Sequence, residues 1–131
     1  MFLDIISVAL GGGLGAVCRY LCGLLPVPKF LGLPVATLTI NFLGAFVICL
    51  LSAFVDHELW KNLNMGDRAM HFAKEGFCGG FTTFSTFSLE MFSLMDSGRH
   101  GIAFLYGILS VVLCLGGVFL GRYLIKAVYC K

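Results

Sequence analysis

The sequence predicts an all-helical (all-α) integral membrane protein with four transmembrane helices. Three observations lead to this fold class. Hydrophobic residues make up 59% of the 131-residue chain, against roughly 45–50% in ordinary soluble proteins. Only 12% of the residues are charged, about half the usual share. The charges also fall between long uncharged stretches, so lipid rather than water is expected to cover most of the surface.

Charged residues divide the chain into four apolar stretches. Residues 30–55 and 101–121 contain no charge, and each run is long enough to cross a bilayer, which takes roughly 20 residues. One charge, Arg19, interrupts the first stretch, and Glu90 interrupts the third. The expected spans, within a single domain of residues 1–131, are 3–25, 34–55, 75–95 and 101–124.

The links between the spans bear on topology. Residues 56–74 are expected to form an interfacial loop or a short amphipathic helix. The N-terminus has no basic region, so the first stretch is not expected to be a cleaved signal. Four spans place both termini on one side, and the few Lys and Arg residues mildly favour the cytoplasm. A bias this weak permits insertion in both orientations.

Composition and motifs exclude several function classes. A net charge of +2 is too small to predict nucleic-acid binding. The six cysteines form no C-x-x-C pair, so neither a zinc site nor a disulfide framework is predicted. No activated nucleophile, general-base pair or nucleotide-binding loop is recognisable, and the chain is not expected to be an enzyme.

Glycines cluster inside the predicted spans. The pairs Gly11/Gly15 and Gly117/Gly121 have the four-residue spacing that lets membrane helices approach closely. They predict tight helix packing and oligomerisation without indicating a function.

The third span departs most from an ordinary helix. In the run 76–90, two adjacent glycines are followed by β-branched and hydroxyl residues, which favours a break within the membrane. Such breaks are tolerated where the freed backbone groups line a cavity or hold an ion. Exposed carbonyls would suit Na⁺. A glycine-rich unbroken helix, with its hydroxyls bonded to its own backbone, is equally compatible with the spacing.

Polar and aromatic side chains lie at helical spacing in three spans. Phe84 and Phe87 share one face of the third span, and their positive ring edges could solvate an anion, although aromatic pairs usually serve packing. Asn41 could donate to an anion or bond a neighbouring helix. Tyr106 and Ser110 form a polar stripe on the fourth span.

The motifs in three spans together resemble one family. They are Gly-Gly-Gly-x-Gly-Ala-x-x-Arg-Tyr at 11–20, Thr-Leu-x-x-Asn-x-x-Gly at 37–44, and Gly-Phe-Cys-Gly-Gly-x-Thr-Thr-Phe-Ser-Thr-Phe-Ser-x-Glu at 76–90. With chain length and span count, they are similar to the Fluc (CrcB) family of fluoride-specific ion channels.

The resemblance implies an antiparallel, dual-topology homodimer in the cell (inner) membrane that exports fluoride passively from the cytoplasm. It implies two pores along the dimer interface and a structural, non-transported Na⁺ at the centre. By position, the backbone carbonyls of Gly79 and Thr82 would hold Na⁺. The pore residues would be Asn41, Phe84, Phe87, Ser85, Thr86, Tyr106 and Ser110, with Glu90 near a pore mouth. Cys114 departs from the hydroxyl that relatives typically carry.

Two alternatives belong to other classes. A small multidrug-type proton-coupled transporter also has four spans, but it needs a membrane-buried carboxylate, for which Glu90 is the only candidate. A purely structural subunit would explain the glycines but not the clustered donors.

Neutral donors suit a conducted anion, since a full positive charge in the pore would slow its exit.

Overall fold

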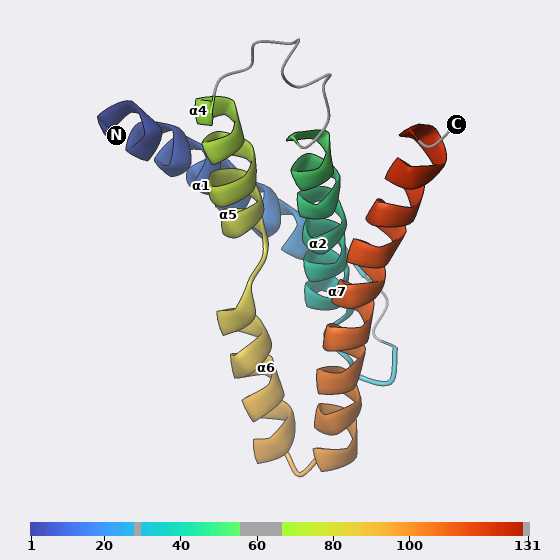
Figure 1. Cartoon of the computed structure of the whole chain (residues 1–131). Coiled ribbons are helices and arrows are strands. Elements are labelled where there is room, and N and C mark those ends of the chain that lie inside the picture. The colour runs from blue at the N-terminus through green and yellow to red at the C-terminus, as the bar shows by residue number, and fades with distance from the viewer. Residues whose placement is uncertain (28–29, 56–66, 130–131) are drawn as a thin grey trace.

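A computed structural model describes residues 1–27, 30–55 and 67–129. Within these ranges every regular element is a helix (Figure 1). The elements are α1 (Phe2–Gly23), α2 (Val35–Val55), α4 (Asp67–Met70), the π-helix η1 (His71–Cys78), α5 (Gly79–Phe81), α6 (Phe84–Asp96) and α7 (His100–Tyr129). Helix α1 begins and α7 ends at the same end of the bundle, and the α6–α7 turn lies at the other (Figure 1).

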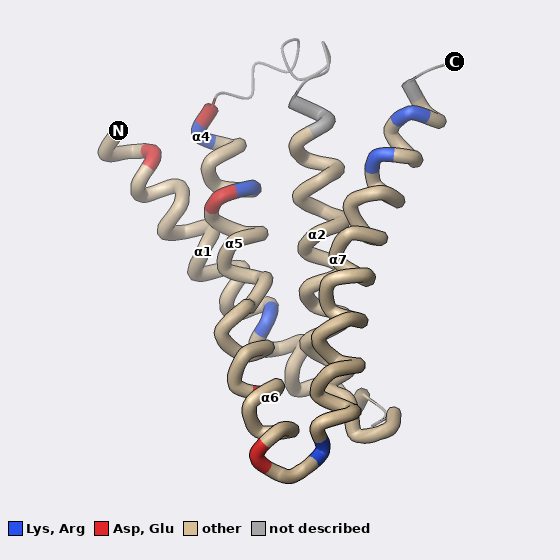
Figure 2. The backbone as a smooth tube through the Cα atoms, turned by 60° about the horizontal axis from the view of Figure 1, so that its bottom comes forward, with Lys and Arg blue, Asp and Glu red and all other residues tan. Residues whose placement is uncertain are grey.

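Three of these helices, α1, α2 and α7, are long and apolar enough to cross a membrane. The predicted third span is instead built from two helical pieces: α4, η1 and α5 run on from one another, and α6 follows after an interruption. The first piece begins at Asp67 rather than at residue 75. The predicted link 56–74 is therefore helical from Asp67 onward, and its residues 56–66 lie outside the described ranges. Charged residues gather towards the two ends of the bundle (Figure 2).

Glycine determines how α1 packs. Helix α1 packs chiefly on η1 and α5. A Cβ at Gly11 would collide with the Phe72 carbonyl, and one at Gly15 with the Phe77 carbonyl. On the other side of this contact, a Cβ added at Gly80 of α5 would collide with the Gly12 carbonyl of α1. These helices therefore meet backbone to backbone, as small-residue spacing in membrane helices predicts.

The second packed pair, α2 with α7, also meets at glycines. A Cβ at Gly117 would lie 2.9 Å from the Phe42 carbonyl oxygen, and one at Gly121 would lie 3.1 Å from Cβ of Cys49. Both helices are regular along their described length. They form the continuous side of the molecule.

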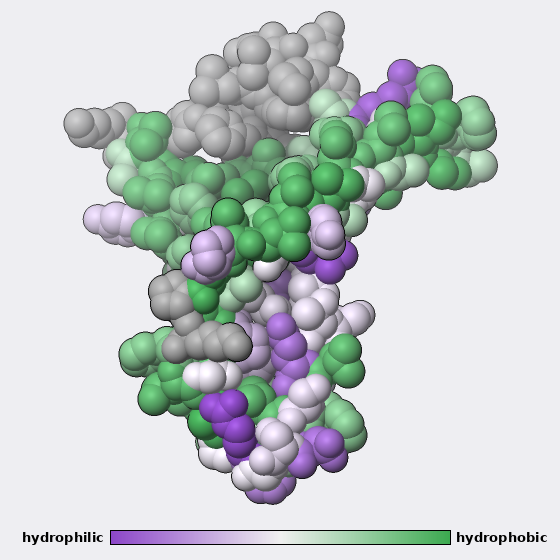
Figure 3. Space-filling model, turned by 180° about the vertical axis from the view of Figure 1, so that it is seen from behind, coloured by the Kyte–Doolittle hydropathy of each residue, from purple (hydrophilic) through white to green (hydrophobic). Residues whose placement is uncertain are grey.

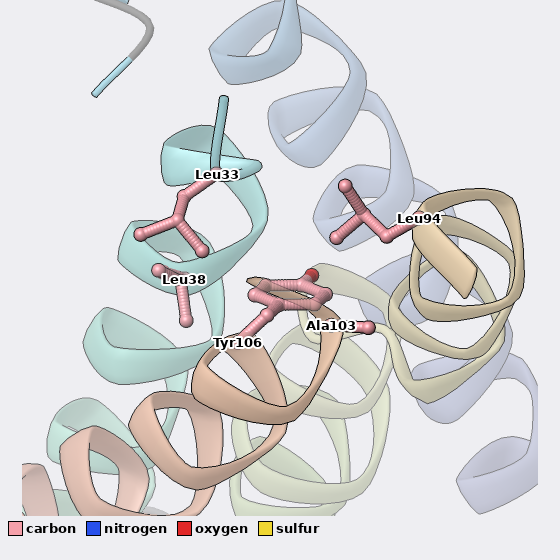
Figure 4. Packing of buried hydrophobic residues seen from close by; sticks show 5 residues of the cluster. All are labelled: Leu33, Leu38, Leu94, Ala103 and Tyr106. Atoms are coloured by element: carbon pink, nitrogen blue, oxygen red, sulfur yellow. The ribbon is translucent and has the colours of Figure 1, made fainter. Parts of the chain in front are cut away.

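A small apolar core joins the lower ends of α2, α6 and α7. Its buried residues are Leu33, Leu38, Leu94, Ala103 and Tyr106, and the Tyr106 ring lies between the other side chains (Figure 4). Beside it, the Arg99 guanidinium donates a 2.7 Å bond to the Leu31 carbonyl, which ties the α6–α7 turn to the segment before α2. This end of the bundle is thus fixed around Tyr106.

The outer surface remains largely apolar. Apolar side chains cover much of the face seen from behind, and polar residues gather in its lower part (Figure 3). Phe2, Phe104 and Phe119 are among many exposed large hydrophobics. Such a surface suits lipid or a second chain rather than water.

Candidate functional site

The helix interruption falls at Thr82 and Thr83. Both residues have extended backbones, with ψ of 157° at Thr82 and φ of −148° at Thr83. Gly79 and Gly80, which drew attention to this run, are themselves helical. The Thr83 hydroxyl instead caps α6 by accepting from the Thr86 amide at 3.1 Å. The break therefore lies where a β-branched residue can act as an N-cap.

Asn41 of α2 is paired with the backbone at the break. Its Nδ2 donates to the Thr83 carbonyl at 3.1 Å, and the Thr83 amide donates to its Oδ1 at 2.8 Å. One side chain thus satisfies both backbone groups of an extended residue, which would be costly to leave unpaired within a membrane. Of the two roles that the sequence allowed for Asn41, this is the hydrogen bond to a neighbouring segment. The second Nδ2 hydrogen remains available as a donor.

The break also leaves backbone carbonyls close to it in the sequence without the amide partners that a continuous helix would give them. In a continuous helix the Gly79 carbonyl would accept from the Thr83 amide, but that amide bonds Asn41. The Gly80 carbonyl accepts from Arg19 Nε at 3.2 Å. Among the described residues, the carbonyls of Gly79 and Thr82 receive no hydrogen bond. Oxygens left without a donor are the ligands a hard cation prefers, so this pair fits Na⁺.

An open hollow of about 320 Å³ lies beside these carbonyls and is called here the carbonyl hollow. It lies between α2, α7 and both pieces of the third segment. Its lining residues are Asn41, Gly44, Ala45, Ile48, Cys78, Gly79, Thr82, Thr83, Phe84 and Cys114. The hollow therefore combines free carbonyls, an amide donor, an aromatic ring and two thiols.

A second hollow, of about 440 Å³, lies on the α1 side of the break and is called the carboxylate hollow. Its polar lining residues are Arg19, Tyr20, Thr37, Thr83, Thr86 and Glu90. Thr83 lines both hollows, so the extended residue bonded to Asn41 is part of the wall between them.

Glu90 accepts two hydrogen bonds at this hollow. Thr37 Oγ1 donates to one carboxylate oxygen at 2.9 Å, and the Tyr106 hydroxyl donates to the other at 2.6 Å. The Tyr106 side chain is fully buried. Its hydroxyl proton is already committed to Glu90, so Tyr106 is not a free donor in this arrangement. Thr37, which the sequence did not single out as a site residue, completes the group.

Aromatic rings connect the break to this group. The Phe84 and Phe87 ring centroids are 5.5 Å apart, and Phe87 lies 5.1 Å from Tyr106. Phe87 packs on the apolar core, whereas Phe84 is 79% exposed. One member of the expected ring pair therefore has a packing role in the single chain, and the other faces outward.

The remaining candidate residues are hydroxyls. The Thr86 oxygen accepts from Thr83 Oγ1 at 2.9 Å, which leaves the Thr86 proton available. Ser85 is exposed at the start of α6. The buried Ser110 hydroxyl has no hydrogen-bond partner among the described residues. An unpaired hydroxyl at membrane depth is a group that a passing ion could use.

Sequence reasoning missed two contacts that hold the site. Arg19 reaches a backbone carbonyl at the break, and Thr37 reaches Glu90. A charge and a hydroxyl inside apolar stretches were the available signals, but their partners lie 61 and 53 residues away in sequence. Only the helix packing brings them together.

The chain is similar to one described protein family over most of its length. A family model described as "CrcB-like protein, Camphor Resistance (CrcB)" matches residues 6–122. A protein of Gloeothece citriformis is 39% identical over 95% of this chain and 98% of its own. One of Ruminiclostridium cellulolyticum is 40% identical over 96% and 95%, and one of Methanococcus maripaludis 42% identical over 91% and 93%. All three are named "Fluoride-specific ion channel FluC".

Proposed function

The chain belongs to the CrcB family of multi-pass membrane proteins, and from that premise we propose that it is a fluoride-specific ion channel. Its relatives are named as ion channels rather than enzymes. The channel would let fluoride leave the cytoplasm passively through the cell membrane and so lower its intracellular concentration. The observation that carries this proposal is the interrupted third segment with neutral donors beside it, in a chain about 40% identical to fluoride channels.

Fluoride is small and strongly hydrated, so its passage requires donors that replace water. The free Nδ2 hydrogen of Asn41 and the hydroxyl protons of Thr86 and Ser110 are available for this. Ring edges of Phe84 and Phe87 and the exposed Ser85 hydroxyl add weaker partners. None of these groups carries a full charge, so an ion can leave as readily as it enters.

Glu90 would work with Tyr106 as a positioned acceptor rather than as a proton carrier. Its two hydrogen bonds, to Thr37 and Tyr106, stabilise the carboxylate beside the hollow. Movement of either donor from Glu90 towards a fluoride ion would create another binding position. This pairing, together with the names of the relatives, does not favour the proton-coupled transporter.

A four-span antiparallel homodimer, inserted in both orientations, would complete the route. Phe84 and many α1 residues are exposed in the single chain, and the carbonyl hollow is open. A second copy would cover both. Within the dimer, the Gly79 and Thr82 carbonyls of each chain would hold a structural Na⁺, which would supply fixed positive charge near the break. Their lack of hydrogen-bond donors among the described residues supports this assignment.

Anion efflux from proteoliposomes tests the function. Vesicles loaded with fluoride or with chloride are prepared with purified, monodisperse protein, and release is followed with ion-selective electrodes after potassium permeability is supplied. We expect rapid fluoride release and chloride release near that of protein-free vesicles. Equal release of both anions, or no fluoride release from folded protein, would reject the proposal.

A further inference from the structure

The C-terminal end of α7 differs in charge from the other helix ends beside it. It carries only Lys and Arg, whereas the ends of α1 and of the α4–η1 piece carry both signs (Figure 2). There, Arg68 lies 3.5 Å from the Asp4 carboxylate. Arg122 and Lys126 of α7 are exposed, and neither forms an ion pair within the part of the chain that the structure describes. No Asp or Glu follows Asp96 in the sequence, so this helix end offers its two cations no partner of its own.

Aromatic rings lie on the same face of α7 as these two cations. Phe119, Arg122, Tyr123 and Lys126 follow the i, i+3, i+4, i+7 spacing that places side chains on one face of a helix. Phe119 is 72% exposed and Tyr123 is 70% exposed. Gly121, on the other side of the helix, packs on α2. These four residues, called here the basic-aromatic face, therefore point away from the bundle in the single chain.

Helix length places the basic-aromatic face at the border of the hydrocarbon. As a helix, the uncharged run 101–121 rises about 31 Å, which matches the roughly 30 Å hydrocarbon core of a bilayer. Arg122 is the first charged residue after that run, and Lys126 follows about 6 Å further along the helix axis. The two cations therefore lie at the depth of the lipid phosphates, and the Phe119 ring lies on the side of the acyl chains.

We infer that the basic-aromatic face binds the headgroup of an anionic phospholipid. The Arg122 guanidinium can donate two parallel hydrogen bonds to a phosphate, and Lys126 adds a second positive charge one turn away. Phe119 can contact the acyl chains, while Tyr123 combines an apolar ring with a hydroxyl that can reach the headgroup. A zwitterionic lipid is a poorer match, because its own ammonium group offsets the phosphate and is repelled by the two cations. This binding does not depend on the proposed conduction of fluoride.

Competition between two lipids with identical acyl chains tests the headgroup preference. Purified full-length protein in a non-ionic detergent receives equal amounts of phosphatidylglycerol and phosphatidylcholine, and the lipid retained per chain is measured by native mass spectrometry. We expect the natural chain to retain phosphatidylglycerol at least about tenfold better, because each basic side chain near the membrane surface attracts anionic lipid. In Arg122→Gln/Lys126→Gln the preference should fall below about threefold. Arg68→Gln/Lys74→Gln is the matched control, which loses the same charge from α4 and η1 and should keep the preference.

Thermal midpoints in nanodiscs of each lipid provide a second measurement, because a lipid that binds the folded protein raises its midpoint. The natural chain should have the higher midpoint in phosphatidylglycerol, and the difference should shrink in Lys126→Gln. This single exposed substitution decides the outcome should the double variant fail to fold. No preference in the natural chain, which is the result expected if a second copy covers the face, would overturn the site. So would a preference that survives in the α7 variants, or one that is lost equally in the control.

Discussion

The continuous pair α2/α7 and the interrupted segment from Asp67 to Asp96 respond differently to the same apolar environment. Helices α2 and α7 keep their backbone bonds internal along their described length, and a few glycines let them pack. The interrupted segment loses its helical hydrogen bonds at Thr82–Thr83, and its backbone groups there are hydrogen-bonded by side chains of α1 and α2 instead. Continuity provides the scaffold, and the interruption provides groups that can interact with an ion.

Side-chain hydrogen bonds from the neighbouring helices explain why the interruption is stable. Asn41 satisfies both backbone groups of Thr83, and Arg19 satisfies the Gly80 carbonyl. The carbonyls of Gly79 and Thr82 remain free among the described residues. The break is therefore supported on two sides and left open on the side of the carbonyl hollow. Changes to the support should affect folding, changes to the open side should affect transport, and changes to Asn41, which belongs to both, should affect both.

The largest effect is expected where α1 supports the interrupted segment. In Gly15→Leu the new side chain collides with the Phe77 carbonyl and the Phe81 amide, so destabilisation should reach or exceed about 3 kcal/mol. Gly13→Leu is the matched control, because a Cβ there meets nothing within 4 Å. The yield of monodisperse protein and its thermal midpoint report the difference. Equal loss in both variants would show that the glycine contact does not hold the segment.

A somewhat smaller effect is expected at Asn41. Asn41→Ala leaves the Thr83 amide and carbonyl unpaired, which should cost about 2 kcal/mol and reduce fluoride efflux. Asn41→Asp also loses the donor to Thr83 and places negative charge in the hollow, so its efflux should be lower still. Thr39→Ala is the control, since that exposed hydroxyl bonds only the Val35 carbonyl of its own helix. Efflux equal to that of the control would remove Asn41 from the route.

The sequence predicted the regular side of this comparison better than the irregular side. Uncharged length alone indicates α2 and α7, and the hydroxyl-rich run after Gly79–Gly80 indicates a break. It could not place the break at Thr82–Thr83, because that depends on Asn41 reaching Thr83 from another helix. Nor does it signal the π-helical bonding of η1, for which we find no local cause.

The sequence also identified some properties of the site residues and not others. Asn41, Phe84 and Ser110 were identifiable as unusual polar or aromatic positions in apolar spans. The bonds of Asn41 to Thr83, 42 residues away, depend on tertiary packing, as does the donation of the Tyr106 proton to Glu90 on another helix. Local residue type therefore identifies candidates, and only tertiary packing distinguishes free donors from bonded ones.

An intermediate effect is expected from Tyr106→Phe. Removing its hydroxyl leaves Glu90 with only Thr37 as donor, which should lower stability by about 1.5 kcal/mol. Tyr123→Phe on the same helix is 70% exposed and should change stability by less than about 0.5 kcal/mol. Thermal midpoints of the two variants provide the comparison. A Tyr106→Phe midpoint matching that of Tyr123→Phe would show that the bond to Glu90 contributes nothing.

The smallest effect on stability is expected at Ser110. Its buried hydroxyl has no partner among the described residues, so Ser110→Ala should leave the thermal midpoint unchanged or raise it slightly. Fluoride efflux should nevertheless fall, since a donor is lost from the proposed route. Ser93→Ala, an exposed position bonded within its own helix, should leave both quantities unchanged. A clear loss of stability in Ser110→Ala would indicate a structural hydroxyl instead.

The most direct measurement is amide hydrogen exchange at Thr83, resolved by NMR in lipid nanodiscs. In the natural chain we expect the Thr83 amide to be protected by its bond to the Asn41 side chain. In Asn41→Ala that protection should be lost, while amides of the uninterrupted α7 keep theirs. A Thr83 amide that stays equally protected in the variant would be bonded as in an ordinary helix, and the segment would then not be interrupted and held by Asn41 as described.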